Sequence, residues 1–255
     1  MKKTMLALAM SFAMIALTAQ ESGNIMLSDQ QVVPPQFEGV DLEQTKVEIK
    51  KAPICCFLEQ NLSVEGLNKF YLPEGTVAIE FTINADGKLS NFVVANSVNH
   101  YLDKAVIDCI KKTRGLWRPG EVNGQPSPME KRVYVRFDDP NNRSFNAIAR
   151  DHYMAATKRY YEGKKIARDI FLTDAQKQRK SERFYNNSLK QLQAATVYLP
   201  NDPSLAFWKA KNYEALGMRD EMNKMMQQRK ALLSLELKEQ RLDEHYDLAI
   251  ISLQK

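Results

Sequence analysis

The chain has 255 residues, of which 44% are hydrophobic and 26% charged, and its formal net charge is +5 at pH 7. These fractions are those of a folded globular protein and exclude a disordered or collagen-like chain. The length suits one large domain or two of ordinary size. Residues 20–142 hold 13 Lys and Arg against 17 Asp and Glu (−4), whereas residues 143–255 hold 21 against 14 (+7). This asymmetry predicts two units, the second with either a basic surface or ordinary Lys-rich solvated helices.

Residues 1–19 have the pattern of a secretory signal peptide. Lys2 and Lys3 precede an uncharged, mostly apolar run that ends at Ala19. This run of about 16 residues is shorter than the ~20 residues that a membrane-spanning helix needs. We expect cleavage near Ala19, an exported mature chain and no stable membrane span after cleavage. Retention of the segment as an anchor is the alternative. The polar residues 20–33 are predicted to form a short tether.

The next hundred residues predict an α+β unit. Residues 40–72 look partly helical, with a break at Pro53. Residues 75–83 alternate apolar and polar side chains, as a half-buried strand does, and Asp86-Gly87 is a hairpin signal before a return strand over residues 89–95. Apolar residues at helical spacing then form a stripe that ends before Gly115: Leu102, Ala105, Val106, Cys109 and Ile110. A last alternating segment follows at residues 130–139, so we expect one helix packed on a small antiparallel sheet.

Three cysteines remain in the exported chain: Cys55, Cys56 and Cys109. An exported compartment permits disulfides, and an odd number leaves at least one thiol outside any internal pair. A bridge from Cys109 to Cys55 or Cys56 is one interpretation. Three small buried side chains are the other.

From Arg143 onward the pattern is helical to the C-terminus. Thr173 with Gln176 forms a capping box, Pro203 suits a first helical turn and Gly217 suits a C-terminal cap. The spacing of small residues, an aromatic residue and glycine weakly resembles a tetratricopeptide-type repeat, at Ala206, Ala210, Tyr213 and Gly217. One visible repeat is too few to stack into a stable array. Residues 144–255 are therefore predicted to be either a repeat-like domain or a generic helical bundle.

Short motifs run in a fixed order through residues 34–139: FYLP at 70–73, GTV at 75–77, NADG at 84–87, NS at 96–97, LDKAV at 102–106, WRPG at 117–120, NGQP at 123–126 and VYVRF at 133–137. This ordered series resembles the C-terminal domain of TonB. The resemblance implies that residues 115–126 connect the helix to the last strand. Gly115 can take the left-handed conformation that stops a helix, Trp117 is expected to pack in the core, and Asn123-Gly124 suits a tight turn.

The resemblance implies a periplasmic protein that binds rather than catalyses. TonB domains capture an extended segment of an outer-membrane transporter by adding it as a strand to an open sheet edge. The last strand is the candidate edge, because nothing later in the sequence is predicted to pair with it. Its residues are Arg132, Val133, Tyr134, Val135, Arg136 and Phe137, of which the three apolar ones are expected to face the core. Charges on an edge also protect against aggregation, which is a second interpretation of the two arginines.

We therefore expect an adaptor with an envelope protein, such as a transporter, as its partner and with the helices as a second interaction surface. A TonB-type energy transducer is the alternative if the leader is retained, although a tether of about a dozen residues spans only roughly 40–50 Å when extended. An enzyme is not expected. His100, His152 and His245 form no metal-ligand pair, and no nucleophile or phosphate-loop motif is present. No cofactor, metal or nucleic-acid partner is predicted.

Overall fold

The structure is a computed structural model of the chain, and it describes residues 31–39, 52–64, 73–242 and 248–253. The predicted signal peptide, residues 20–30 of the predicted tether and His245 lie outside these ranges. Everything described belongs to the unit that begins at Gln31.

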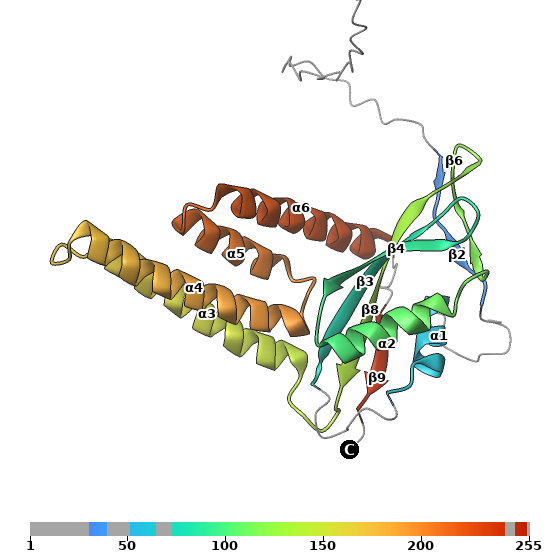
Figure 1. Cartoon of the computed structure of the whole chain (residues 1–255), viewed down its shortest axis with the longest axis horizontal. Coiled ribbons are helices and arrows are strands. Elements are labelled where there is room, and N and C mark those ends of the chain that lie inside the picture. Colours follow the sequence, from blue (N-terminus) through green and yellow to red (C-terminus); the bar gives the residue numbers. More distant parts are fainter. Residues whose placement is uncertain (1–30, 40–51, 65–72, 243–247, 254–255) are drawn as a thin grey trace, which may run out of the picture. The chain divides into compact units, whose positions relative to one another are not determined.

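A four-stranded sheet with the order β4-β3-β8-β9 forms the centre of the first part of the fold (Figure 1). Its strands are β3 (Gly75–Ile83), β4 (Leu89–Asn96), β8 (Met129–Asp138) and β9 (Leu248–Ser252). β3 pairs antiparallel with β4, as the hairpin signal predicted, and it also pairs antiparallel with β8; Gly87 in the hairpin has a φ of +75°. β9 pairs in parallel with β8, so the sheet is mixed rather than purely antiparallel.

Two helices, α2 (His100–Lys111) and α1 (Pro53–Asn61), contribute to the core of this sheet. The predicted stripe on α2 is confirmed, since Leu102, Val106 and Ile110 are fully buried. Pro53 begins α1, because the first helical turn leaves backbone N–H groups without an internal partner and proline has none to lose. Residues 40–51, on the other side of the predicted break, lie outside the described residues. The three cysteines are buried thiols, the second of the two interpretations, and burial raises the pKa of Cys109.

The connection between α2 and β8 forms small strands of its own. β5 (Trp117–Arg118) pairs with β2 (Gln36–Phe37), and β6 (Gly120–Val122) pairs with β1 (Val32–Val33) and β7 (Gln125–Ser127). Positive φ angles at Asn123 (54°) and Gly124 (76°) make the predicted tight turn. Trp117 is 6% exposed and its indole N–H donates to Thr113 Oγ1 at 2.8 Å, so its predicted core role is confirmed.

Four helices follow the sheet: α3 (Phe145–Ala167), α4 (Asp174–Tyr198), α5 (Pro203–Ala215) and α6 (Arg219–Leu242). α3 packs on α4 and α5 on α6 (Figure 1). The capping box is confirmed by Gln176 N to Thr173 Oγ1 at 3.3 Å and Thr173 N to Gln176 Oε1 at 3.1 Å. The prediction of helix to the C-terminus is wrong for residues 248–252, where side chains alternate between core and surface as in a strand.

Candidate functional site

The predicted site strand, residues 132–137, lies within β8, and its two faces are different. Val133, Val135 and Phe137 are each 0% exposed and belong to the core that α2 covers, as predicted. Strand alternation places Arg132, Tyr134 and Arg136 on the opposite face. The apolar set therefore holds the strand in the sheet, and only the polar set faces away from this core.

The polar face of β8 is engaged with neighbouring elements. Arg132 forms an ion pair with Glu80 of β3, and its Nη1 lies 3.4 Å from the Tyr134 hydroxyl. Tyr134 is only 7% exposed. The guanidinium of Arg136 lies 5.1 Å from the ring centroid of Phe145, at the start of α3. Arg136 and Tyr134 thus contribute to the contact between sheet and helices.

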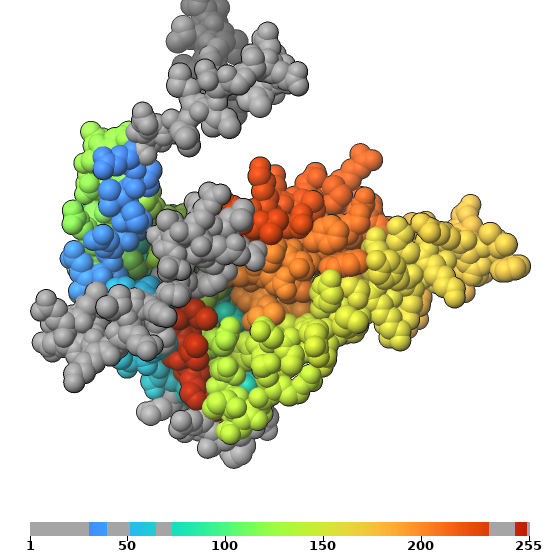
Figure 2. All heavy atoms as spheres, turned by 180° about the vertical axis from the view of Figure 1, so that it is seen from behind, coloured from blue at the N-terminus to red at the C-terminus, as the bar shows by residue number. Residues whose placement is uncertain are grey.

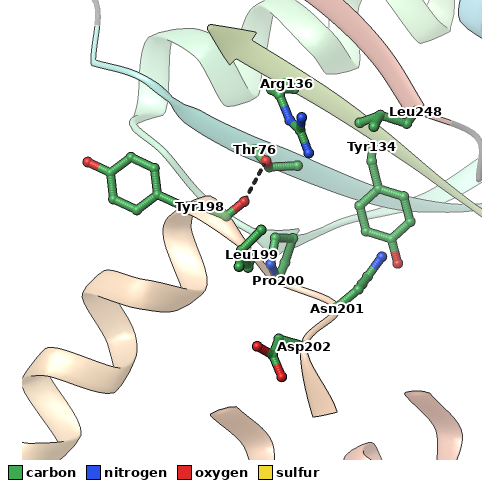
Figure 3. Close-up of a pocket in the computed structure, with 9 residues that line it drawn as sticks. All are labelled: Thr76, Tyr134, Arg136, Tyr198, Leu199, Pro200, Asn201, Asp202 and Leu248. Atoms are coloured by element: carbon green, nitrogen blue, oxygen red, sulfur yellow. Dashed lines mark hydrogen bonds between the residues drawn. The ribbon is translucent and has the colours of Figure 1, made fainter. Parts of the chain in front are cut away.

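A pocket of about 250 Å³ lies between this face and the segment that joins α4 to α5 (Figure 3). The Thr76 hydroxyl on β3 donates to the Tyr198 carbonyl at 3.0 Å. Tyr134 and Arg136 line the pocket from β8, and Leu248 lines it from β9. The pocket therefore lies where three strands of the sheet, β3, β8 and β9, face the end of α4.

The outer edge of β8 is occupied by β9 over residues 134–138. The register pairs Tyr134 with Leu248 and Asp138 with Ser252, and Leu253 N donates to Asp138 O at 2.7 Å. The premise that nothing later in the sequence pairs with this strand is therefore wrong. Four of the six predicted site residues, from Tyr134 to Phe137, have β9 as their neighbour.

β9 itself is held by a few side chains. Ala249 is 0% and Ile251 8% exposed, and both lie in the core, whereas Ile250 on the other face is 43% exposed. Figure 2 shows part of this strand, in dark red, at the surface of the molecule. The Ile250 amide donates to Glu59 Oε1 of α1 at 2.8 Å. Glu59 thereby satisfies a backbone donor that an added strand would otherwise use. Neither β9 nor Glu59 was recognised from the sequence.

The opposite edge of the sheet, β4, is irregular. Its register with β3 shifts twice, between Ala78 and Ile79 and between Glu80 and Thr82. Asn91 has a φ of 52°, a left-handed conformation within the strand. Such bulges twist an edge and leave backbone groups out of line for a new partner. β4 is therefore a poorer template for strand addition than the regular ladder of β8.

Other chemistries have little support in the part of the chain that the structure describes. No group of three His, Cys, Asp or Glu side chains lies close enough there to hold a metal ion. His152 Nδ1 lies 2.8 Å from Gln191 Oε1, a contact between α3 and α4. Within the same described residues, no helix is both long and apolar enough to cross a membrane.

Residues 73–138, about a quarter of the chain, match the family model of the Gram-negative bacterial TonB protein C-terminal. This part of the chain is a TonB C-terminal domain, in agreement with the resemblance read from the sequence. Domains of this family are periplasmic and non-enzymatic. The helical region that follows is not assigned to a family. A search of curated proteins and a search of solved structures each found no match.

Proposed function

We propose that the chain is an exported adaptor that captures an extended peptide of an envelope partner by strand addition. The observation that carries the proposal is the TonB C-terminal domain at residues 73–138. Interaction with outer-membrane transporters is what this family implies, so a transporter segment is the first candidate peptide. Cleavage near Ala19, a periplasmic location and a second interaction surface on the helices are parts of the same proposal.

The acceptor in this proposal is the edge of β8 that β9 occupies. A peptide can pair with residues 134–137 only after β9 leaves, because one edge accepts one strand. β9 then acts as a placeholder that keeps the edge covered while no partner is bound. Two features favour β8 over β4 as the acceptor strand. The ladder between β8 and β3 is regular over nine residue pairs, and the strand that covers the other side of β8 is short and parallel. Parallel pairing is slightly less stable per residue than antiparallel pairing.

Displacement also makes capture reversible. Backbone hydrogen bonds from the peptide to β8 would replace those that β9 makes now, so their number stays about the same. The net free energy of capture therefore depends on side chains rather than on the number of ladder bonds. Apolar side chains at alternate peptide positions would replace Ala249 and Ile251 in the core. We therefore expect the preferred peptide to carry small or branched apolar residues with a spacing of two.

Backbone-resolved hydrogen exchange tests the proposal. The isotope-labelled chain is mixed with synthetic peptides that cover the periplasmic segments of outer-membrane transporters. Capture at the proposed edge is expected to remove protection from the amides of β9 while those of β8 stay protected. Amides of β4 serve as the internal control and are expected to be unchanged. Peptide binding with changes confined to α3–α6 would instead place the binding surface on the helices.

A TonB-type energy transducer is the second candidate, because the matched family is that of the TonB protein itself. It requires residues 1–19 to remain as a membrane anchor. The intact mass of the protein from its native envelope separates the two functions. A mass that lacks the leader supports the adaptor, and a mass that retains Met1 in a membrane fraction supports the transducer.

A further inference from the structure

The turn between α3 and α4 exposes two large apolar side chains. Ile170 is 83% and Phe171 90% exposed, the highest values among the exposed large hydrophobic residues that the structure describes. Tyr161, on the last turns of α3, is 61% exposed. The turn lies at the end of the yellow helical hairpin in Figure 2. Because side chains of this type are usually buried in a folded protein, an exposed adjacent pair indicates an interaction surface.

The exposure of this pair is fixed by an ordered turn. Asp169 Oδ1 accepts a hydrogen bond from the Phe171 amide at 2.9 Å. The capping box of Thr173 and Gln176 then begins α4 immediately after the turn. Local hydrogen bonds therefore order the turn that carries the two exposed side chains. We call these two residues the apolar tip.

Positive charge is concentrated in the segment that contains the apolar tip. Residues 164–180 contain six cations and two acids, a balance of +4. The cations are Lys164, Lys165, Arg168, Lys177, Arg179 and Lys180. Both acids have local roles, since Asp169 accepts the Phe171 amide and Asp174 pairs with Lys177 at 3.2 Å. A surface hollow of about 630 Å³ is lined by Tyr161, by three of the cations and by the tip itself.

We propose that the apolar tip docks on a bilayer that contains anionic phospholipid. Ile170 and Phe171 enter the boundary between headgroups and acyl chains, and the surrounding Lys and Arg side chains contact the lipid phosphates. Long basic side chains suit this arrangement, because their apolar stems can lie along the interface while the charged ends reach the headgroups.

Two adjacent side chains at the end of a hairpin fit a lipid surface better than a protein. A stable protein interface buries about 800 Å² on each partner, far more than two side chains provide. A bilayer needs no complementary pocket, and its attraction sums over several cations near the tip. Docking would hold the helical hairpin at a membrane surface, which is a function separate from peptide capture by the sheet.

Vesicle cosedimentation tests the proposal with the chain from Gln20 onward, since removal of residues 1–19 excludes binding by the apolar leader and takes away no described residue. Vesicles of phosphatidylcholine alone are compared with vesicles that contain phosphatidylglycerol. Wild type is expected to bind the anionic vesicles at least about tenfold more tightly, and added salt is expected to weaken this binding. Ile170→Ser with Phe171→Ser is expected to reduce the affinity at least about tenfold. Arg168→Glu with Lys165→Glu is expected to reduce it as well.

The matched control is Met154→Ser, which changes a 61% exposed apolar residue of α3 outside residues 164–180. Its vesicle affinity is expected to equal that of wild type. Thermal unfolding checks that the tip variants remain folded. In Phe171→Trp, blue-shifted emission and quenching by brominated lipid are expected on anionic vesicles.

Binding that the tip variants leave unchanged would overturn the proposal, as would absence of vesicle binding by folded wild type. Loss of a protein partner in the tip variants without vesicle binding would make the tip a protein-binding surface. Peptide capture by β8 is measured separately and is expected to survive every tip substitution.

Discussion

Ile251→Ala is expected to release β9 locally while the rest of the sheet stays folded. Ile251 is 8% exposed and packs in the core from a strand of five residues at the sheet edge. Truncation of a buried isoleucine costs about 2–5 kcal/mol, depending on how far the site can relax. An edge strand relaxes more easily than a central one, so we take about 2–3 kcal/mol as the cost here.

This cost sets the size of the measured effect. Each 1.4 kcal/mol changes an equilibrium constant tenfold, so the open population of β9 is expected to rise about 30- to 150-fold. If β9 opens as a local unit, its amides will exchange faster by that factor. Amides in β3 and β4 are expected to keep their wild-type rates, because their pairing does not involve β9.

Native-state hydrogen exchange, with Ile250→Ala as the matched control, tests whether β9 opens locally or only with the whole fold. Ile250 lies next to Ile251 on the same strand, but its side chain is 43% exposed and outside the core cluster. Its truncation is expected to change the exchange rates of β9 only a few-fold. Equal acceleration of β3, β4 and β9 in Ile251→Ala would refute local release and show that β9 opens only with the whole fold.

The same variant connects local release to peptide capture. Where a ligand binds only the open edge, its apparent affinity is scaled by the fraction of molecules in which the edge is open. A peptide that competes with β9 is therefore expected to bind Ile251→Ala more tightly, by a factor up to the increase in opening. A peptide that binds the helices would show no such gain.

Three further substitutions test the helical region. Thr173→Ala removes the capping box and is expected to lower the free energy of unfolding by about 1 kcal/mol in urea titration. Gly163→Ala places a methyl group 2.7 Å from the ring of buried Tyr185, so a net loss of about 1 kcal/mol or more is expected despite the better helix propensity of alanine. Burial lowers the pKa of Lys209 from 10.5 to about 8, so the unfolded chain holds more protons than the folded one between these values. Wild-type stability should therefore rise with pH across this window, and Lys209→Met should be more stable at pH 7 by about 1–3 kcal/mol, an advantage that shrinks as the pH approaches 10.5.

Local signals in the sequence predicted the elements that depend on local chemistry. The turns at Asp86-Gly87 and Asn123-Gly124 form because Gly87, Asn123 and Gly124 tolerate the positive φ angles that they adopt. The stripe on α2 is buried because its spacing matches the helical period. Val133 was correctly placed in the core for the corresponding reason in a strand.

The occupied edge of β8 was not predictable in the same way. β9 is five residues long, too short for its alternation to stand out from the helical pattern before it. Its pairing with β8 joins residues more than 100 positions apart, and the packing of the whole chain decides such contacts. Glu59 illustrates the same limit, since its bond to the Ile250 amide spans 191 residues. The candidate strand was therefore identified from the sequence, but its neighbour was not.

The domain boundary predicted between Asp138 and Ser144 is still a prediction, and its test depends on the contacts across it. Two bonds to Glu74 anchor the connecting segment, from the Asp139 amide at 2.9 Å and from Asn142 Nδ2 at 3.0 Å. The chain leaves the sheet at the end of β8, runs through α3–α6, and returns to the sheet as β9, which pairs with β8.

Cleavage of a protease site inserted after Asn141 would break the covalent link between β8 and α3, and β9 would stay joined to the helices. β9 would still pair with β8, Thr76 would still bond the Tyr198 carbonyl, and Arg136 would still stack on Phe145. We expect the two fragments to elute together from a sizing column in native buffer and to separate in urea. Separate elution directly after cleavage would establish two independent domains and leave β9 too weak to hold the edge. In that case the edge of β8 would be open to a partner without any displacement.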